Sequence, residues 1–146
     1  MKRPTALIAD DEPLLREQLA AELARQWPEL DIVALARHGR EAVEAFDAHA
    51  PDIAFLDVHM PGLSGVEVAR HVGKRAHLVF VTAFDQYALE AFEHGALDYL
   101  VKPVTAARLA ETVERLKARV QQAQPAVHSE QLLAQLGARL KLDQPK

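Results

Sequence analysis

The stretch Asp52-Ile53-Ala54-Phe55-Leu56-Asp57 places four apolar residues in a row between two carboxylates. An uninterrupted apolar run of this length predicts a strand that is buried on both faces, as in a parallel sheet. The segment His59-Met60-Pro61-Gly62 then turns the chain, so the strand ends at Asp57. Because open α/β sheets bind ligands at the carboxyl ends of their strands, Asp57 is a candidate site residue. Taken alone, an Asp at this position is better explained as a cap of the following turn.

Four more apolar segments have the pattern of strands, and predicted helices separate them. The five predicted strands are residues 5–9, 32–36, 52–57, 77–82 and 97–101. The predicted helices begin at Pro13, at Gly39, near Leu63, near Gln86 and before Leu109. Trp27 and Pro28 stop the first helix, and Gly65 interrupts the third, which covers residues 63–72. This alternation predicts an α/β protein with a parallel sheet and helices on both of its faces.

The C-terminal part of the chain has a different pattern. Residues 121–127 are polar and contain Pro125, which is typical of a linker. Ser129 can cap a last helix, whose apolar side carries Leu132, Leu133, Leu136 and Leu140. A helix this short is marginal by itself. We expect it to pack on its own domain, on a second copy or on a domain absent from this chain.

Composition limits the possible functions. The chain has 146 residues, 49% of them hydrophobic and 26% charged, as in an ordinary soluble globular domain. With a formal net charge of -4 and no dense Lys/Arg run, the chain alone is not expected to bind nucleic acid. The absence of cysteine excludes disulfides and thiolate metal sites. The sequence predicts neither a membrane span nor a signal peptide, so we expect a cytoplasmic protein.

Polar residues stand at the ends of four predicted strands. Asp10 and Asp11 follow the first strand, Asp57 ends the third, Thr82 ends the fourth, and Lys102 follows the fifth. Each has an ordinary explanation alone, such as a helix N-terminus, a turn or a solvated surface. Together they would meet at one edge of the sheet, where converging carboxylates raise each other's pKa and favour a cation such as Mg²⁺. A carboxylate, a hydroxyl, a lysine and Mg²⁺ suit phosphoryl transfer to an aspartate.

These residues lie in motifs that resemble the receiver domain of bacterial two-component response regulators. The motifs are Ala9-Asp10-Asp11-Glu12-Pro13, the run from Leu56 to Gly65 (LDVHMPGLSG), Val81-Thr82-Ala83 and Tyr99-Leu100-Val101-Lys102-Pro103. The resemblance covers residues 5–120 and implies the CheY-like, flavodoxin-like strand order 2-1-3-4-5. Residues 82–92 and 96–99 are similar to the subfamily whose output is a LytTR DNA-binding domain.

The resemblance also implies a role for each site residue. Asp57 would accept a phosphoryl group from a histidine kinase. Asp11 would bind Mg²⁺ directly, Asp10 mostly through water, and His59 through its backbone carbonyl. Asp57 would also belong to the metal site. Mg²⁺ is the one cofactor that the resemblance implies.

The remaining implied roles belong to the response to phosphorylation. Thr82 and Lys102 would each contact a phosphoryl oxygen, and Tyr99 would turn inward when Thr82 moves. The Lys102–Pro103 bond is expected to be cis. The expected switch surface comprises the fourth helix, the fifth strand and the fifth helix. Its outward residues would include Glu90, Glu93, His94, Arg108, Glu111 and Arg115.

For the whole protein we expect a receiver domain over residues 1–122 and a linker with a short helix over residues 123–146. The receiver would catalyse its own phosphorylation and dephosphorylation without being an enzyme for another substrate. Its expected partners are a sensor histidine kinase and, after phosphorylation, a second copy. DNA binding would belong to an output domain that this chain lacks.

Three alternatives remain open at the level of sequence. An FMN-binding flavodoxin shares the architecture, but Asp10, Asp11 and Glu12 would repel the phosphate of FMN. A haloacid-dehalogenase-type phosphatase would want an acid two residues after Asp57, where His59 stands. A pseudo-receiver would act only through protein interactions, and the intact set of site residues argues against it.

Overall fold

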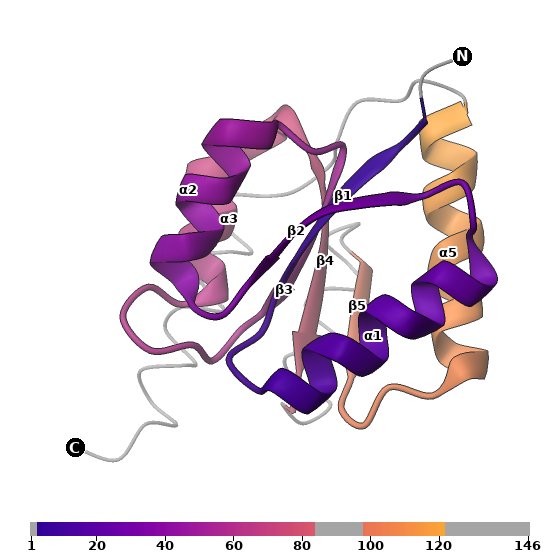
Figure 1. Cartoon of the computed structure of the whole chain (residues 1–146), viewed down its shortest axis with the longest axis horizontal. Coiled ribbons are helices and arrows are strands. Elements are labelled where there is room, and N and C mark those ends of the chain that lie inside the picture. The colour runs from indigo at the N-terminus through magenta and orange to yellow at the C-terminus, as the bar shows by residue number, and fades with distance from the viewer. Residues whose placement is uncertain (1–2, 84–97, 122–146) are drawn as a thin grey trace.

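The computed structural model describes residues 3–83 and 98–121, which form a sheet flanked by helices (Figure 1). The strands are β1 (Thr5–Ala9), β2 (Asp31–Ala36), β3 (Ile53–Asp57), β4 (His77–Thr82) and β5 (Asp98–Val101). The helices are α1 (Pro13–Gln26), α2 (Gly39–His49), α3 (Gly65–Val72) and α5 (Ala106–Gln121), with a 3-10 turn, η1 (Gly73–Arg75), after α3. The helix predicted near Gln86 and the tail helix predicted from Ser129 lie outside the described residues.

The strands form one sheet in the order β2-β1-β3-β4-β5, and all four pairings are parallel. The α/β class and this strand order confirm the expectation from the sequence. β3 lies in the centre, and all five of its residues are buried. A central strand has no polar face because helices cover both sides of the sheet, which explains the unbroken apolar run that ends at Asp57.

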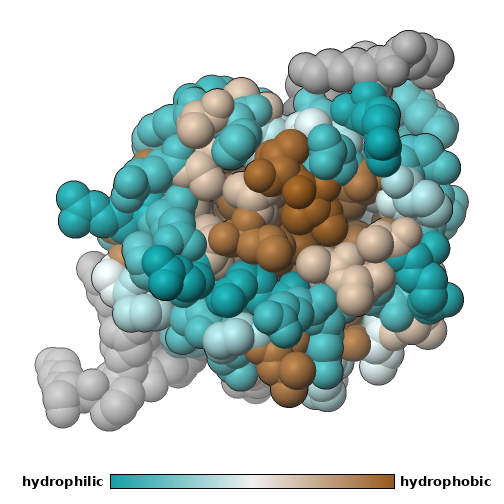
Figure 2. All heavy atoms as spheres, in the orientation of Figure 1, coloured by the Kyte–Doolittle hydropathy of each residue, from teal (hydrophilic) through white to brown (hydrophobic). Residues whose placement is uncertain are grey.

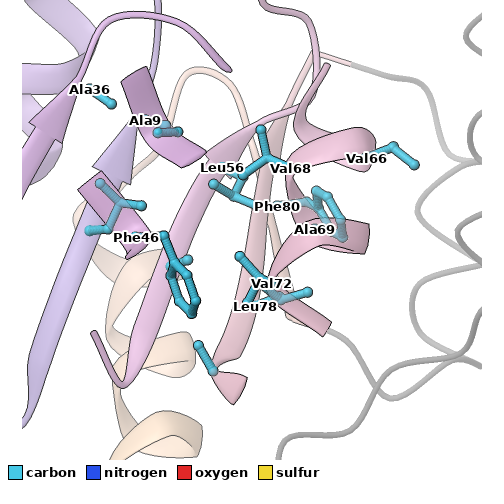
Figure 3. Packing of buried hydrophobic residues seen from close by; sticks show 14 of the residues in the cluster. Ala9, Ala36, Phe46, Leu56, Val66, Val68, Ala69, Val72, Leu78 and Phe80 are labelled. Carbon is cyan, nitrogen blue, oxygen red and sulfur yellow. The ribbon is translucent and has the colours of Figure 1, made fainter. Parts of the chain in front are cut away.

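Two cores pack on opposite faces of the sheet, and alternate residues of β3 supply both. Leu56 packs with Phe46 of α2 and Phe80 of β4 beneath α2 and α3 (Figure 3). Phe55 belongs to the second core, which α1 and α5 cover on the other side (Figure 1). Figure 2 shows apolar residues gathered over the edge strand β2, where Leu35 is 45% exposed.

The start of α3 corrects one prediction. Gly65 does not interrupt a helix that begins near Leu63, because it is the first residue of α3. Ser64 caps this helix: its hydroxyl accepts the N–H of Glu67 at 3.2 Å, and the Glu67 carboxylate accepts the N–H of Ser64 at 3.1 Å. This reciprocal capping box places the N-cap at Ser64, so the helix starts at Gly65. The β3–α3 connection is therefore longer than the sequence pattern suggests.

Candidate functional site

The polar residues predicted at the strand ends meet at the carboxyl edge of the sheet. Asp10 directly follows β1, Asp57 ends β3, Thr82 ends β4 and Lys102 directly follows β5. The Lys102 N–H donates to the carbonyl of Thr82 at 2.9 Å, which ties the ends of β4 and β5 together. Asp10, Asp57 and Thr82 are all buried at this edge, with at most 3% of each residue exposed. The grouping is therefore as predicted.

The ammonium of Lys102 connects the acids of this edge. Its Nζ atom lies 3.3 Å from Asp10 Oδ2, 3.3 Å from Asp57 Oδ2 and 3.3 Å from Glu12 Oε1. Burial would lower the pKa of Lys102, but the charges of Asp57 and Asp10 outweigh it and raise the pKa above its ordinary value. Lys102 is therefore a fixed positive charge beside Asp57 at any physiological pH.

Asp57 is the most strongly perturbed acid among the described residues. The pKa of its carboxyl is raised from 3.8 to about 7, and burial is the largest cause. The negative charge of Asp10 and a hydrogen bond with Asp11 also contribute to this rise, whereas Lys102 opposes it. One lysine therefore does not neutralise the converging carboxylates, and the site favours an additional positive charge.

Three consecutive acids lie beside Asp57 and provide oxygen ligands for such a charge. Carboxylate oxygens of Asp10, Asp11 and Glu12 all lie within 4.8 Å of one another. Hard divalent cations such as Mg²⁺ prefer oxygen ligands, so this set of donors fits the implied cofactor. Asp57 is not part of this close group and is linked to it through Lys102.

Glu12 is the site residue that the sequence did not single out. Its position after two acids marked it as part of an acidic motif that favours a helix N-terminus and would repel a phosphate, but gave it no role in the site. In the structure its carboxylate contacts Lys102, which is 90 residues away in the chain. The run of three acids was the available signal, and only the fold shows which lysine it meets.

Backbone contacts hold the two buried aspartates in place. Asp10 Oδ1 accepts the N–H of Glu12 at 2.9 Å, and Arg16 Nη1 donates to the Asp10 carbonyl at 2.7 Å. Asp57 Oδ1 accepts the N–H of His59 at 3.3 Å, and the His59 residue is exposed. The role expected for the His59 carbonyl as a metal ligand stays a prediction. The Lys102–Pro103 bond is cis, as expected.

The expected switch surface is only partly within the described residues. Thr82 is completely buried. Tyr99 lies on β5 opposite Phe80 of β4, and its side chain lies outside the described part of the structure. On α5, Glu111 and Arg115 are exposed as predicted, whereas Arg108 is half-buried and its Nη1 donates to Thr112 Oγ1 at 3.0 Å. The remaining predicted residues, Glu90, Glu93 and His94, lie outside the described ranges.

This combination of fold and site is that of a receiver domain, and comparison with known families agrees. Residues 6–114 match the family model of the response regulator receiver domain. The match covers most of the chain, so the chain belongs to this family of two-component response regulators. Among the residues that the structure describes, no helix has both the length and the apolar character needed to cross a membrane.

Individual relatives place the chain more closely. An uncharacterised response regulatory protein of Vibrio cholerae is 49% identical over 116 residues, which are 77% of this chain and 44% of the relative. The transcriptional regulatory protein BtsR of Escherichia coli is 44% identical over 113 residues, 76% of this chain and 47% of BtsR. The chain thus spans less than half the length of these relatives.

A solved structure shows the same fold. The receiver domain of AraT, a response regulator from Geobacillus stearothermophilus, is 32% identical and superposes with a TM-score of 0.74. The superposition covers 84% of this chain and 99% of the AraT domain. The chain is therefore similar to an isolated receiver domain over nearly the whole of that domain.

Proposed function

We propose that Asp57 accepts a phosphoryl group from the phosphohistidine of a sensor histidine kinase in a reaction that requires Mg²⁺. The observation that carries this proposal is the buried Asp57 carboxylate, 3.3 Å from Lys102 and beside a close group of three further acids. A buried carboxylate at the end of a central strand does not stabilise the core, because burying its charge costs free energy unless that charge is compensated. Membership in the receiver family supports the same assignment.

The chemistry follows from the positions of the side chains. Ionised Asp57 attacks the phosphorus atom, so an Oδ–P bond forms while the N–P bond of the phosphohistidine breaks and the imidazole takes up a proton. Lys102 lowers the pKa of Asp57, which favours the ionised carboxylate, and offers its ammonium to a phosphoryl oxygen. The buried Thr82 hydroxyl is the expected second donor. Bound Mg²⁺ would supply positive charge against the phosphoryl oxygens. Water later cleaves the acyl phosphate and releases inorganic phosphate. In this proposal the domain catalyses its own phosphorylation and dephosphorylation and is not an enzyme for another substrate.

Labelling by a small phosphodonor tests the acceptor. With acetyl phosphate and Mg²⁺, we expect intact-mass spectrometry to show one added phosphoryl group, and Asp57→Asn should abolish it. Asp47→Asn is the matched control, since Asp47 is an exposed acid of α2 that contacts His71 away from the site. Equal labelling of the Asp57→Asn protein would contradict the assignment, and no labelling of the natural chain would favour a pseudo-receiver. Release of phosphate from a generic phosphate ester would favour a phosphatase.

We further propose that phosphorylation acts on the segment between Thr82 and Lys102. These two residues bracket residues 83–101, and both lie at the carboxyl edge beside Asp57. Because the phosphoryl group adds nearly two negative charges and three acceptor oxygens, both residues gain a contact that is absent beforehand. The expected consequence is a change in the surface of the fourth helix, β5 and α5, with Tyr99 as its aromatic switch, and pairing of two copies there.

Hydrogen exchange and light scattering test this switch. Beryllofluoride with Mg²⁺, a mimic of the phosphoryl group, should change the protection of residues 84–120 and increase the molecular mass, and Tyr99→Ala should weaken the effect. Unchanged mass and protection would contradict the proposal. If only a chain truncated after Gln124 fails to dimerise, the dimer contact lies in the tail.

The relatives support a role for the whole protein. Because the chain spans less than half of relatives that include a transcriptional regulator, we propose that residues 1–122 are the receiver and residues 123–146 lead to a LytTR-type DNA-binding domain. Such a protein would act in the cytoplasm, where a kinase phosphorylates it and it reaches DNA. The sequence of the parent gene beyond Lys146 tests this directly, and the lack of an output domain there would contradict it.

A further inference from the structure

Glu12 occupies the N-cap position of α1 but does not cap the helix. Residues at this position usually accept a hydrogen bond from a backbone N–H of the first turn, and Glu12 makes no such side-chain bond. Its carboxylate instead lies 3.3 Å from Lys102 Nζ. The Glu12 side chain therefore does not cap the N-terminus of α1. It contacts Lys102, the lysine that also contacts Asp57.

The three contacts of Lys102 leave no ammonium donor for a new partner. An ammonium has three N–H groups, and three carboxylates stand at 3.3 Å from this one, those of Asp10, Glu12 and Asp57. In phosphorylated Asp57 the acceptor for the third donor is a phosphoryl oxygen, which lies farther from β3 than the carboxylate oxygen that Lys102 now contacts. Nζ must therefore move outward to reach it, and this movement separates it from Asp10 or Glu12.

Burial decides which contact Lys102 releases. The Asp10 side chain is 5% exposed and its other oxygen is held by the N–H of Glu12, so an unpaired Asp10 would be a buried, uncompensated charge. Asp57 itself carries the phosphoryl group. The Glu12 side chain is 60% exposed, so water can solvate its carboxylate as soon as the lysine leaves. Glu12 is thus the partner whose release costs the least free energy.

We propose that Glu12 is a positioning residue that tethers Lys102 in the unphosphorylated site and opposes phosphorylation of Asp57. The second part rests on the proposed function, whereas the tether itself does not. An exposed acid of this kind contributes up to about 1 kcal/mol, so its removal should favour the phosphorylated state by about two- to fivefold.

Three variants separate the tether from the effect of charge. Glu12→Gln removes the charge, and Glu12→Asp keeps the charge but is one methylene too short for the same contact. Asp is also a better N-cap, so helix α1 should not be weakened by this change. Glu17→Gln removes the same charge from an exposed position of α1 outside the site and is the matched control.

The first readout is the Lys102 ammonium signal in ¹H–¹⁵N spectra without phosphodonor. The tether predicts faster proton exchange at Lys102 Nζ in Glu12→Asp and Glu12→Gln, and no change in Glu17→Gln. Unchanged exchange in both Glu12 variants would overturn the tether, whether or not Asp57 is phosphorylated.

The second readout is the rate of labelling by acetyl phosphate at saturating Mg²⁺, with the affinity for beryllofluoride measured in parallel. We expect both to rise about two- to fivefold in Glu12→Asp as well as in Glu12→Gln. A rise in Glu12→Gln alone would overturn the tether in favour of charge repulsion, and a fall in both would show that Glu12 assists the phosphorylated state. If the natural chain is not labelled but the ammonium signal responds, the proposed function fails and the tether stands.

Discussion

Asp57 combines the features that a phosphoryl acceptor needs and that a packing residue would avoid. Its side chain is 4% exposed, and burial together with Asp10 raises its pKa to about 7. A carboxyl with this pKa is held partly protonated near neutral pH and becomes ionised when positive charge arrives. The free energy of unfolding therefore depends on pH through the protonation of Asp57.

Asp57→Asn should stabilise the metal-free protein at alkaline pH. The folded chain keeps the Asp57 proton up to a pKa of about 7, against 3.8 for an ordinary Asp, so the natural protein loses stability relative to the variant as pH rises between these values. Urea unfolding in EDTA at pH 8.5 should show the variant more stable by roughly 2–4 kcal/mol, with the difference shrinking toward pH 4.

The stability difference has its own control. Mg²⁺ should stabilise the natural protein more than Asp57→Asn, because the cation compensates a charge that the variant lacks. A difference between the two proteins that is the same at pH 5 and pH 8.5 would show that burial of the Asp57 charge is not its cause.

At the scale of single residues, the sequence predicted the acids and the lysine but not all their contacts. Asp10, Asp57 and Lys102 were found because parallel strands end at one edge, so strand ends predict spatial neighbours without further information. The contact of Glu12 with Lys102 was not predicted, because it depends on the direction of a side chain at a helix N-terminus. No pattern along the chain encodes that direction.

At the scale of elements, the β3–α3 connection holds Asp57 through a close approach of backbones. A Cβ atom on Gly65 would lie 2.2 Å from the Asp57 carbonyl oxygen and 3.0 Å from Val58 Cα. The Gly65 N–H donates to the Val58 carbonyl at 2.9 Å, so the first turn of α3 packs directly on the end of β3. Gly65, which the sequence pattern suggested as a helix interruption, allows this close contact because it has no Cβ atom.

Gly65→Ala should therefore impair both stability and labelling of Asp57. The methyl group has no room unless the ends of β3 and α3 separate, which should cost about 1–3 kcal/mol and slow phosphorylation. Ser64→Ala is the control, because losing the cap should cost about 1 kcal/mol without moving Asp57. Denaturation and acetyl phosphate labelling measure the two effects. If Gly65→Ala is labelled at the natural rate, the close approach does not position the acceptor.

At the scale of the whole molecule, α1 packs along the sheet with the site at its N-terminal end and a buried core residue at its C-terminal end. Trp27 follows α1 at its C-terminal end, is 4% exposed and packs in the core beneath α1 and α5. The acids precede the N-terminus of the same helix. The parallel sheet with helices on both faces was predictable, since alternating apolar strands and helices allow few packings. The strand order was expected from the resemblance to receiver domains. Two stretches, residues 84–97 and 122–146, remain predictions from the sequence alone.

Trp27 fluorescence should follow unfolding but not metal binding. The residue lies about 15 positions along α1 from the acids, roughly 22 Å at 1.5 Å per residue. Its emission should shift to the red on denaturation, because burial ends, and should stay constant on titration with Mg²⁺. Strong quenching by Mg²⁺ would place the metal elsewhere or show that α1 responds as a whole.

The central claim is that Asp57, and no other acid of the edge, accepts the phosphoryl group. The most direct test labels the natural chain with acetyl phosphate and Mg²⁺, reduces the acyl phosphate with borohydride and locates the resulting homoserine by tandem mass spectrometry. We expect the reduced residue at position 57 only. Homoserine at Asp10 or Asp11, 5-hydroxynorvaline at Glu12, or no reduced acid at all despite saturating Mg²⁺, would contradict the account.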